Sequence, residues 1–254
     1  MYATAAYADV RRAMSNVAAV SWIETQSRYD PEGRLTLRNT HHIWVRKSPP
    51  AIAEEDSAST VPQIKGGEYA GAARVLSDAH GQIRYDIRDH VYYLHPPADI
   101  VREVQSAVDS LTAREMASGP IQKSFTTLHG HPAILFTQPV HFHASPDQKA
   151  RIAFDGEDKV WADPQTLRVL RRRSDLAYAP YCVPNSRLIP VTISAQRIIV
   201  DATEFVYNTP TPTGIFDLRP PKNAHVTEDD GKGNKTVVIS AASRSESRSD
   251  SNGK

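Results

Sequence analysis

The chain opens with a helical pattern and continues with alternation typical of strands. Residues 30–33, Asp-Pro-Glu-Gly, have the chemistry of a turn, because Pro presets φ and Gly accepts a positive φ. They separate two alternating segments, residues 20–29 and 35–47, which are therefore predicted to form a hairpin. The helix is predicted over residues 5–18, where apolar side chains recur at steps of three and four: Tyr7, Val10, Met14 and Val17.

The stretch after the hairpin is less regular. Residues 48–67 contain Pro, Ser and Glu without periodicity, so we expect a long loop. In that loop, Glu54, Glu55 and Asp56 are expected to be a solvated acidic run. Strand-like patterns return over residues 70–76, 82–87 and 90–94, which predicts a second set of short strands.

A second amphipathic pattern covers residues 98–116. Asp99 is suited to cap its amino end, and Gly119-Pro120 stops it. This pattern predicts a single helix between two blocks of strands. Its apolar stripe consists of Ile100, Val104, Ala107, Val108 and Leu111.

The second block of strands is denser than the first. Residues 155–158, Asp-Gly-Glu-Asp, are expected to be a hairpin turn. On the last strand, simple alternation places Ile199, Phe205 and Tyr207 on one face. The strands are predicted over residues 123–128, 132–137, 151–154, 159–162, 167–172, 188–194 and 197–207.

The end of the chain has a different composition. No aromatic residue occurs in residues 226–254, and Ser, Arg, Asp, Gly and Lys dominate the final residues. Such a segment buries too little apolar surface to offset the entropy lost on ordering. We therefore expect a folded domain over residues 1–224 and a disordered polar tail over residues 225–254, in which residues 237–239 could add a brief edge strand.

Together the patterns predict a mainly β fold with two helices. Repeated strand–helix–strand units are missing, so antiparallel pairing is expected. The order of elements suits a curved antiparallel sheet, an unclosed barrel, wrapped around the two helices. A concave apolar face that helices cover only in part is a candidate site for a lipid or acyl chain.

Composition narrows the function classes. With 30 Lys and Arg against 29 Asp and Glu, the net charge of +1 gives no electrostatic case for a nucleic-acid partner. No apolar run approaches the length of a membrane span. Cys182 is the only cysteine, so an internal disulfide framework and a cysteine-based zinc cluster are excluded.

Nucleotide and hydrolase motifs are missing, and histidines are the main enzymatic lead. On strands, residues two apart share a face, so either His129 and His131 or His141 and His143 could present two imidazoles to a metal ion. Both pairs lie beside turn signals, where surface histidines are common. The only basic cluster includes Arg171, Arg172 and Arg173, which fits a solvated strand face better than an anion site.

Three segments resemble a known family. They are residues 7–22, residues 151–166 with the sequence Lys-Val-Trp-Ala-Asp-Pro-Gln-Thr from Lys159, and residues 205–221 with Phe-Val-Tyr-Asn and Phe-Asp-Leu-Arg-Pro-Pro. Together they resemble the LolA-like outer-membrane lipoprotein carriers and the related RseB-like regulators of the sigma-E response. The resemblance implies an unclosed barrel lidded by helices, with a periplasmic or otherwise extracytoplasmic location. It also implies binding without a reaction, with neither catalytic residues nor a cofactor. Residues 1–7 lack the charged and apolar regions of a secretory signal.

We therefore expect non-catalytic binding of a lipid acyl chain or lipoprotein, for carriage or envelope sensing. Two alternatives stay open: a regulatory module of the sigma-E type that binds a membrane-anchored partner, and a metal-dependent enzyme using the four histidines. The residues expected to line the apolar cleft are Trp22, Trp44, Ile100, Val104, Phe154, Trp161, Phe205 and Tyr207.

Overall fold

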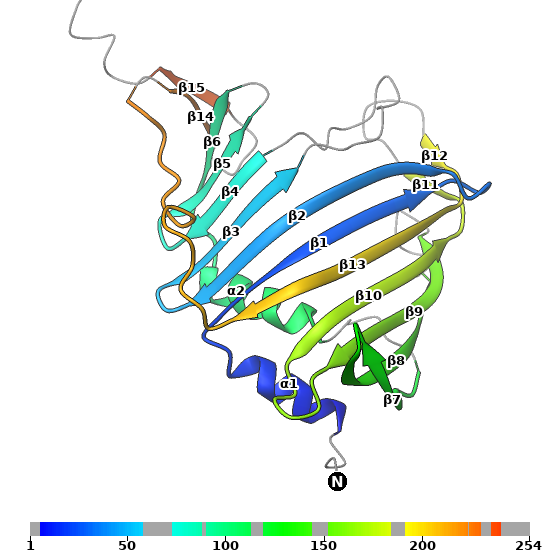
Figure 1. The fold of residues 1–254 in the computed structure, drawn as a ribbon. Helices are drawn as coiled ribbons and strands as arrows, with labels where there is room; N and C mark the ends of the chain where they lie inside the picture. The colour runs from blue at the N-terminus through cyan, green and yellow to red at the C-terminus, as the bar shows by residue number, and fades with distance from the viewer. Residues whose placement is uncertain are drawn as a thin grey trace, which may run out of the picture.

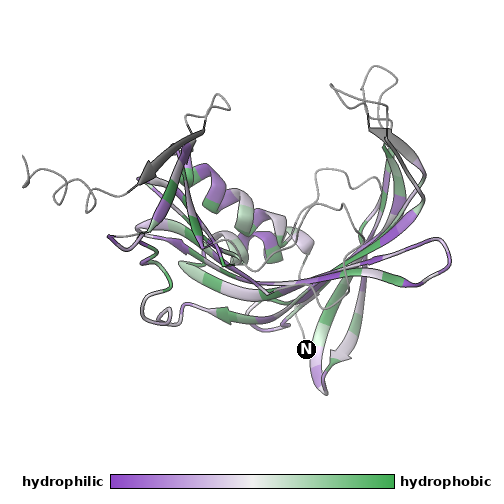
Figure 2. Ribbon diagram, turned by 90° about the horizontal axis from the view of Figure 1, so that it is seen from above, coloured by the Kyte–Doolittle hydropathy of each residue, from purple (hydrophilic) through white to green (hydrophobic). Residues whose placement is uncertain are grey.

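A computed structural model describes residues 6–57, 73–87, 90–112, 119–143, 152–183, 191–222, 224–229 and 235–239. Most of these residues belong to one large sheet, which curves into an open trough with the helices on its concave side (Figures 1 and 2). The expected fold class, an unclosed and mainly antiparallel sheet around two helices, is confirmed.

The large sheet has thirteen strands, ordered β15-β14-β6-β5-β4-β3-β2-β1-β13-β10-β9-β8-β7. All neighbours pair antiparallel except β14 and β6, which are parallel. A separate two-stranded sheet joins β11 (Tyr181–Val183) and β12 (Val191–Ile193). The strands of the large sheet are β1 (Ala19–Tyr29), β2 (Leu35–Lys47), β3 (Pro50–Ser57), β4 (Ala73–Asp78), β5 (Gly81–Asp86), β6 (Val91–His95), β7 (Gln122–Leu128), β8 (His131–His143), β9 (Ala153–Ala162), β10 (Val169–Tyr178), β13 (Gln196–Tyr207), β14 (His225–Asp229) and β15 (Lys235–Ile239).

Both predicted helices form, though each is shorter than its pattern: α1 (Tyr7–Ser15) and α2 (Ile100–Ser110). Asp99 caps α2 as expected, because its side chain accepts a hydrogen bond from the Arg102 backbone N–H at 3.2 Å. Neither described helix has the length and apolar run needed to cross a bilayer.

The expected loop over residues 48–67 is wrong in its first part, which forms β3. Ala51 and Ala53 are buried on one side of this strand, while Glu54 and Asp56 lie on the other. Residues 50–53 are apolar and mostly small, and residues 54–57 are acidic and polar, so the segment lacks the alternation by which a strand is recognised from sequence. Residues 58–72 lie outside the described part of the chain.

The expected turn at residues 155–158 is also wrong, since β9 runs through it without interruption. Gly156 is needed there for close packing rather than for turning. A Cβ at this position would lie 2.0 Å from the carbonyl oxygen of Asp175 on β10. The glycine therefore marks a close approach of two backbones.

A bulge changes the faces of β13. The register between β1 and β13 shifts between Ser21 and Ile23, opposite Glu204, whose φ is +55°. One extra residue reverses the alternation after it. Ile199 and Phe205 therefore do not share a face as predicted: Ala202 and Phe205 both pack in the core beside the helices.

The tail differs from the expected disorder in its first part. His225–Asp229 pairs with β6 as β14, and Lys235–Ile239 pairs with β14 as the outermost strand β15, which includes the expected strand at residues 237–239. Val226 is buried. Residues 240–254 lie outside the described part of the chain.

The core is divided between the two faces of the sheet. A smaller cluster lies on the convex face, where residues 215–218 pack on β2–β6 around Trp44, Leu76 and Leu218. The main cluster lies on the concave face and joins both helices to the sheet through Val10, Met14, Val17, Val20, Trp22, Val45, Ile100, Val104, Val108, Leu111, Ile134, Phe136, Val160, Ala162, Val169 and Ala202.

Candidate functional site on the concave face

Strand register defines the concave face. Trp22 pairs with Ile43 and belongs to the main core with the helices, so alternation places Glu24 and His41, the next pair on that side, on the same face. The same reasoning across β3 adds Glu54 and Asp56. The concave face therefore carries the apolar Trp22 and Ile43 next to the polar side chains of Glu24, His41, Glu54 and Asp56.

Five of the expected cleft residues meet at the helical end of this face. Trp22, Ile100 and Val104 are only 3–7% exposed, and Phe205 and Tyr207 pack against the same cluster. The rings of Trp22 and Phe205 stack with centroids 6.2 Å apart. These side chains therefore pack together where the helices meet the sheet.

Tyr207 is fixed within this cluster. Its hydroxyl donates a hydrogen bond of 2.6 Å to the Val169 carbonyl oxygen, and burial raises the pKa of the phenol. Arg168 lies over its ring, with the guanidinium carbon 5.3 Å from the centroid. The Tyr207 side chain therefore joins β13 to β10 at the end of the trough.

Phe154 lies on the concave face but in a separate apolar cluster, here called the distal cluster. Its buried members are Val140, Phe154 and Leu176, and neither helix contributes to it. The Phe154 ring lies 4.8 Å from that of Tyr178, its register partner on β10. The concave face therefore holds two apolar regions, and the helices cover one.

Trp44 and Trp161 were predicted for the cleft, but both lie on the convex face. Trp44 packs in the cluster under residues 215–218, and its ring stacks on His42 at 3.7 Å. Trp161 pairs with Arg171, whose guanidinium lies 5.3 Å from its ring centroid. Each tryptophan is one position out of phase with the inward residues of its strand, so alternation directs it outward.

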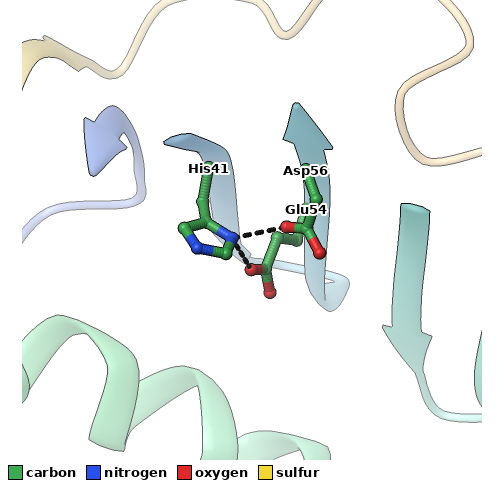
Figure 3. A group of neighbouring side chains, drawn as sticks. All are labelled: His41, Glu54 and Asp56. Atoms are coloured by element: carbon green, nitrogen blue, oxygen red, sulfur yellow. Dashed lines mark hydrogen bonds and ion pairs between the residues drawn. The ribbon is translucent and has the colours of Figure 1, made fainter. Parts of the chain in front are cut away.

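A polar band separates the two apolar regions. Its central feature, here called the His41 cluster, consists of His41, Glu54 and Asp56. Figure 3 shows the Nδ1 atom of His41 facing both carboxylates, at 2.9 Å from Glu54 Oε1 and 2.5 Å from Asp56 Oδ1. Hydrogen bonds to Asp56 and then Glu54 raise the pKa of His41 to about 10, against partial burial.

The band continues across β1 and β10. Burial raises the pKa of Glu24, while the charges of His41 and Arg172 oppose that rise. The Arg172 Nη2 atom lies 3.0 Å from Asp158 Oδ2, and Ser174 Oγ donates to the same carboxylate. The concave face therefore carries partly buried charged groups and is not uniformly apolar.

Three buried polar atoms, in Arg28, Asn39 and Arg172, have no hydrogen-bond partner among the described residues. Register places all three residues on the concave face. Because most buried polar groups in folded proteins are satisfied, these are positions where water can supply a partner.

The arginine cluster is structural. Arg171 forms two contacts with Asp201, at 2.9 and 2.5 Å, and Arg173 lies 3.8 Å from Asp175. Arg172 is paired with Asp158 on the opposite face. Each guanidinium is paired with a carboxylate of the chain. The expected strand-face role fits Arg171 and Arg173, whereas Arg172 is buried on the concave face.

The four histidines of the metal-enzyme alternative do not converge. His131 and His143 are the two ends of the thirteen-residue strand β8, so their backbones are about 40 Å apart. His141 pairs instead with Asp155 at 2.8 Å. His129 and His131 line a cavity of about 700 Å³ beside the β13 bulge, which also contains Leu170 and Phe205 and no helix residue.

Sequence reasoning did not find the His41 cluster. His41 lies on an alternating segment, residues 35–47, but residues 50–57 do not alternate and carry no strand signal of their own. The cluster depends on the pairing of β2 with β3, and residues 50–57 were expected to be loop. Without that strand no register could bring the three side chains together.

Comparisons with known proteins place the chain in no family. No family model matches it, and no curated protein matches it. Similar solved structures include an uncharacterized conserved protein from Thermus thermophilus, with 10% identity, a TM-score of 0.40, and coverage of 88% of this chain and 97% of that one. Another is the Mycobacterium tuberculosis lipoprotein LppX, with 13% identity, a TM-score of 0.42, and coverage of 81% and 96%. A DUF1329 family protein from Desulfovibrio piger has 9% identity, a TM-score of 0.33, and coverage of 83% and 95%.

Proposed function

We propose that this protein binds the acyl chain of a lipid or lipoprotein on the concave face, between α2 and the sheet, and catalyses no reaction. The observation that carries this proposal is how α2 is held. Its contacts with the sheet are made by aliphatic side chains, which have no directional requirement. An acyl chain can make the same contacts. The buried side chains are Ile100, Val104, Val108 and Leu111.

The polar contacts of α2 are at one end. Tyr7 donates its hydroxyl to the Thr112 carbonyl oxygen, and Arg172 donates to the Ser110 carbonyl oxygen. Among the described residues, these are the hydrogen bonds that tie this helical segment to α1 and the sheet. The amino-terminal half, with Ile100 and Val104, is therefore the part that a guest could displace.

Magnitudes allow such an exchange. Burying four aliphatic side chains contributes about 6–12 kcal/mol, at about 1.5–3 kcal/mol each. Twelve methylenes of an acyl chain contribute about 10 kcal/mol before ordering costs, at about 0.8 kcal/mol each. Because the two quantities are similar, a chain could replace the helix contacts without a large net loss of stability.

Matched tryptophan variants test the proposal. Native mass spectrometry of the gently purified chain should show a retained acyl lipid, and a fluorescent fatty acid should bind after delipidation. Val104→Trp adds bulk between α2 and the sheet, where the acyl chain is proposed to lie, and should weaken binding at least tenfold. Val101→Trp adds the same volume on the exposed side of that helix and should leave binding unchanged.

Circular dichroism checks that each variant is folded. If Val104→Trp does not fold, Phe205→Trp replaces it as the variant with added bulk on the inward side. Absence of any fatty-acid binding by the unaltered chain would refute the proposal. Equal binding by the Val104 and Val101 variants would do the same, because it would place the chain elsewhere.

The role proposed for this binding is lipid or lipoprotein carriage, or sensing, at a cell envelope. The resemblance of the three sequence segments to lipoprotein carriers supports an extracytoplasmic location. Cell fractionation with an antibody against the full chain tests it: we expect the protein in the envelope fraction, and recovery in the cytosol alone would contradict the location.

A further inference from the structure

The His41 cluster offers a second kind of chemistry on the concave face. We propose that it binds one divalent transition-metal ion of the zinc type, through His41 Nδ1 and one carboxylate oxygen each from Glu54 and Asp56. This site is independent of acyl-chain binding.

The geometry of the three donors supports a common ligand. Their candidate ligand atoms all lie within 4.8 Å of one another. His41 and Asp56 are register partners on β2 and β3, and Glu54 lies diagonally beside them (Figure 3). Side chains carried on two paired strands are held in place more firmly than side chains on loops. A metal ion would occupy the position where both carboxylates now converge on one nitrogen.

Partial burial makes the donors accessible yet shielded. The side chains of His41, Glu54 and Asp56 are 21%, 34% and 22% exposed. An ion can enter from the trough, while the neighbouring apolar residues Ile43 and Ile52 reduce screening by water.

The surrounding charge favours a cation. Glu24 is the register partner of His41 on its other side, so carboxylates flank the imidazole from both neighbouring strands. Arg172 is the cation that acts on Glu24 from β10, and it is already paired with Asp158. Glu24, Glu54 and Asp56 therefore exceed the positive charge available to them locally.

A separate observation also points to a ligand. Asn39 is more than nine-tenths buried, and its Oδ1 atom has no hydrogen-bond partner among the described residues. Register places Asn39 on the same face as the cluster, two residues from His41. A water molecule bound to a metal ion would give this oxygen the partner it lacks.

Donor chemistry selects the class of metal. An imidazole nitrogen with two carboxylates suits zinc and its first-row neighbours, and an open position would remain for water. Calcium and magnesium prefer oxygen ligands alone. The cluster should therefore discriminate against calcium.

Calorimetry with zinc chloride tests the site on the full untagged chain after chelator treatment. We expect one Zn²⁺ per chain and no heat from calcium chloride under the same conditions. His41→Ala and Asp56→Asn should each weaken zinc binding at least tenfold. The matched control is His141→Ala, which removes an exposed histidine–carboxylate pair and should leave binding unchanged.

Cobalt substitution provides a second readout that does not depend on affinity alone. Co²⁺ should give a visible absorption band that His41→Ala abolishes and His141→Ala retains, with circular dichroism confirming that both variants are folded. Zinc binding that survives His41→Ala, or no binding by the unaltered chain, would overturn the proposal. Val104→Trp should leave zinc binding intact, so failure of the metal site and failure of acyl-chain binding are distinguishable.

Discussion

Single residues at close contacts carry much of the specificity of this sheet. Gly156 allows β9 to approach β10 so closely that a methyl group has no space beside Asp175. We predict that Gly156→Ala lowers the free energy of unfolding by about 3 kcal/mol, since overpacking forces the backbone to move. Chemical denaturation measures this change.

Gly33→Ala is the matched control for the glycine prediction. Gly33 has φ of +80° and open space around its Cβ position, so its replacement introduces only backbone strain of about 1–2 kcal/mol. Equal losses for the two variants would show that the β9–β10 approach is not tight.

Tyr7 should make the stability of the helical end depend on alkaline pH. Burial, followed by the charge of Asp158, raises the pKa of its phenol to about 12. The unfolded chain loses this proton near pH 10, so the contribution of Tyr7 is complete below pH 10 and is lost as the pH rises through about 12.

Denaturation of the unaltered chain and of Tyr7→Phe between pH 9 and pH 12 measures this effect. We expect the unaltered chain to lose more stability than the variant over that range. Parallel curves would show that the phenol is not buried against α2 in solution.

Residue-level predictions from sequence succeeded where the cause was local. Asp99 caps its helix because its partner lies three residues away. Trp44 and Trp161 were assigned to the cleft as large aromatic residues, although their side of the sheet depends on alternation. Size favours burial for such residues on either face, so it cannot identify the cleft.

At the scale of elements, α2 is the part on which the proposed function depends. Leu111 is almost fully buried at its carboxyl end, and Leu111→Ala should lower the free energy of unfolding by about 2–5 kcal/mol. Val101→Ala, on the exposed side of the helix, should change it by less than about 0.5 kcal/mol. Thermal and urea denaturation measure the stability of both variants. Equal losses of unfolding free energy would contradict the packing of Leu111 described above.

Elements with strong periodicity were predicted well, and elements defined by a partner were not. Both helices and the β1–β2 hairpin follow from local patterns. The apolar residues of β3 are mostly small and give a weak strand pattern. The strand forms because β2 and β4 pair along its two edges. The β13 bulge likewise depends on its pairing with β1, which alternation within one strand cannot reveal.

At the scale of the whole molecule, the curved sheet and its helices were predictable from element order. The position of the late strands was not, because β14 joins β6 across more than 120 residues of chain. The polar character of the concave face was also missed. It arises because β3, β2 and β1 lie side by side, with β10 on the far side of β13, and no single segment shows it.

The central claim is that a guest acyl chain lies between α2 and the concave face. Photolabelling with a diazirine-bearing fatty acid, followed by peptide mapping, tests it most directly. Labels should fall on α2 and on inward positions such as Trp22 and Val45. Labels confined to the cavity beside His129 and His131, or on convex residues such as Trp161, would contradict the claim.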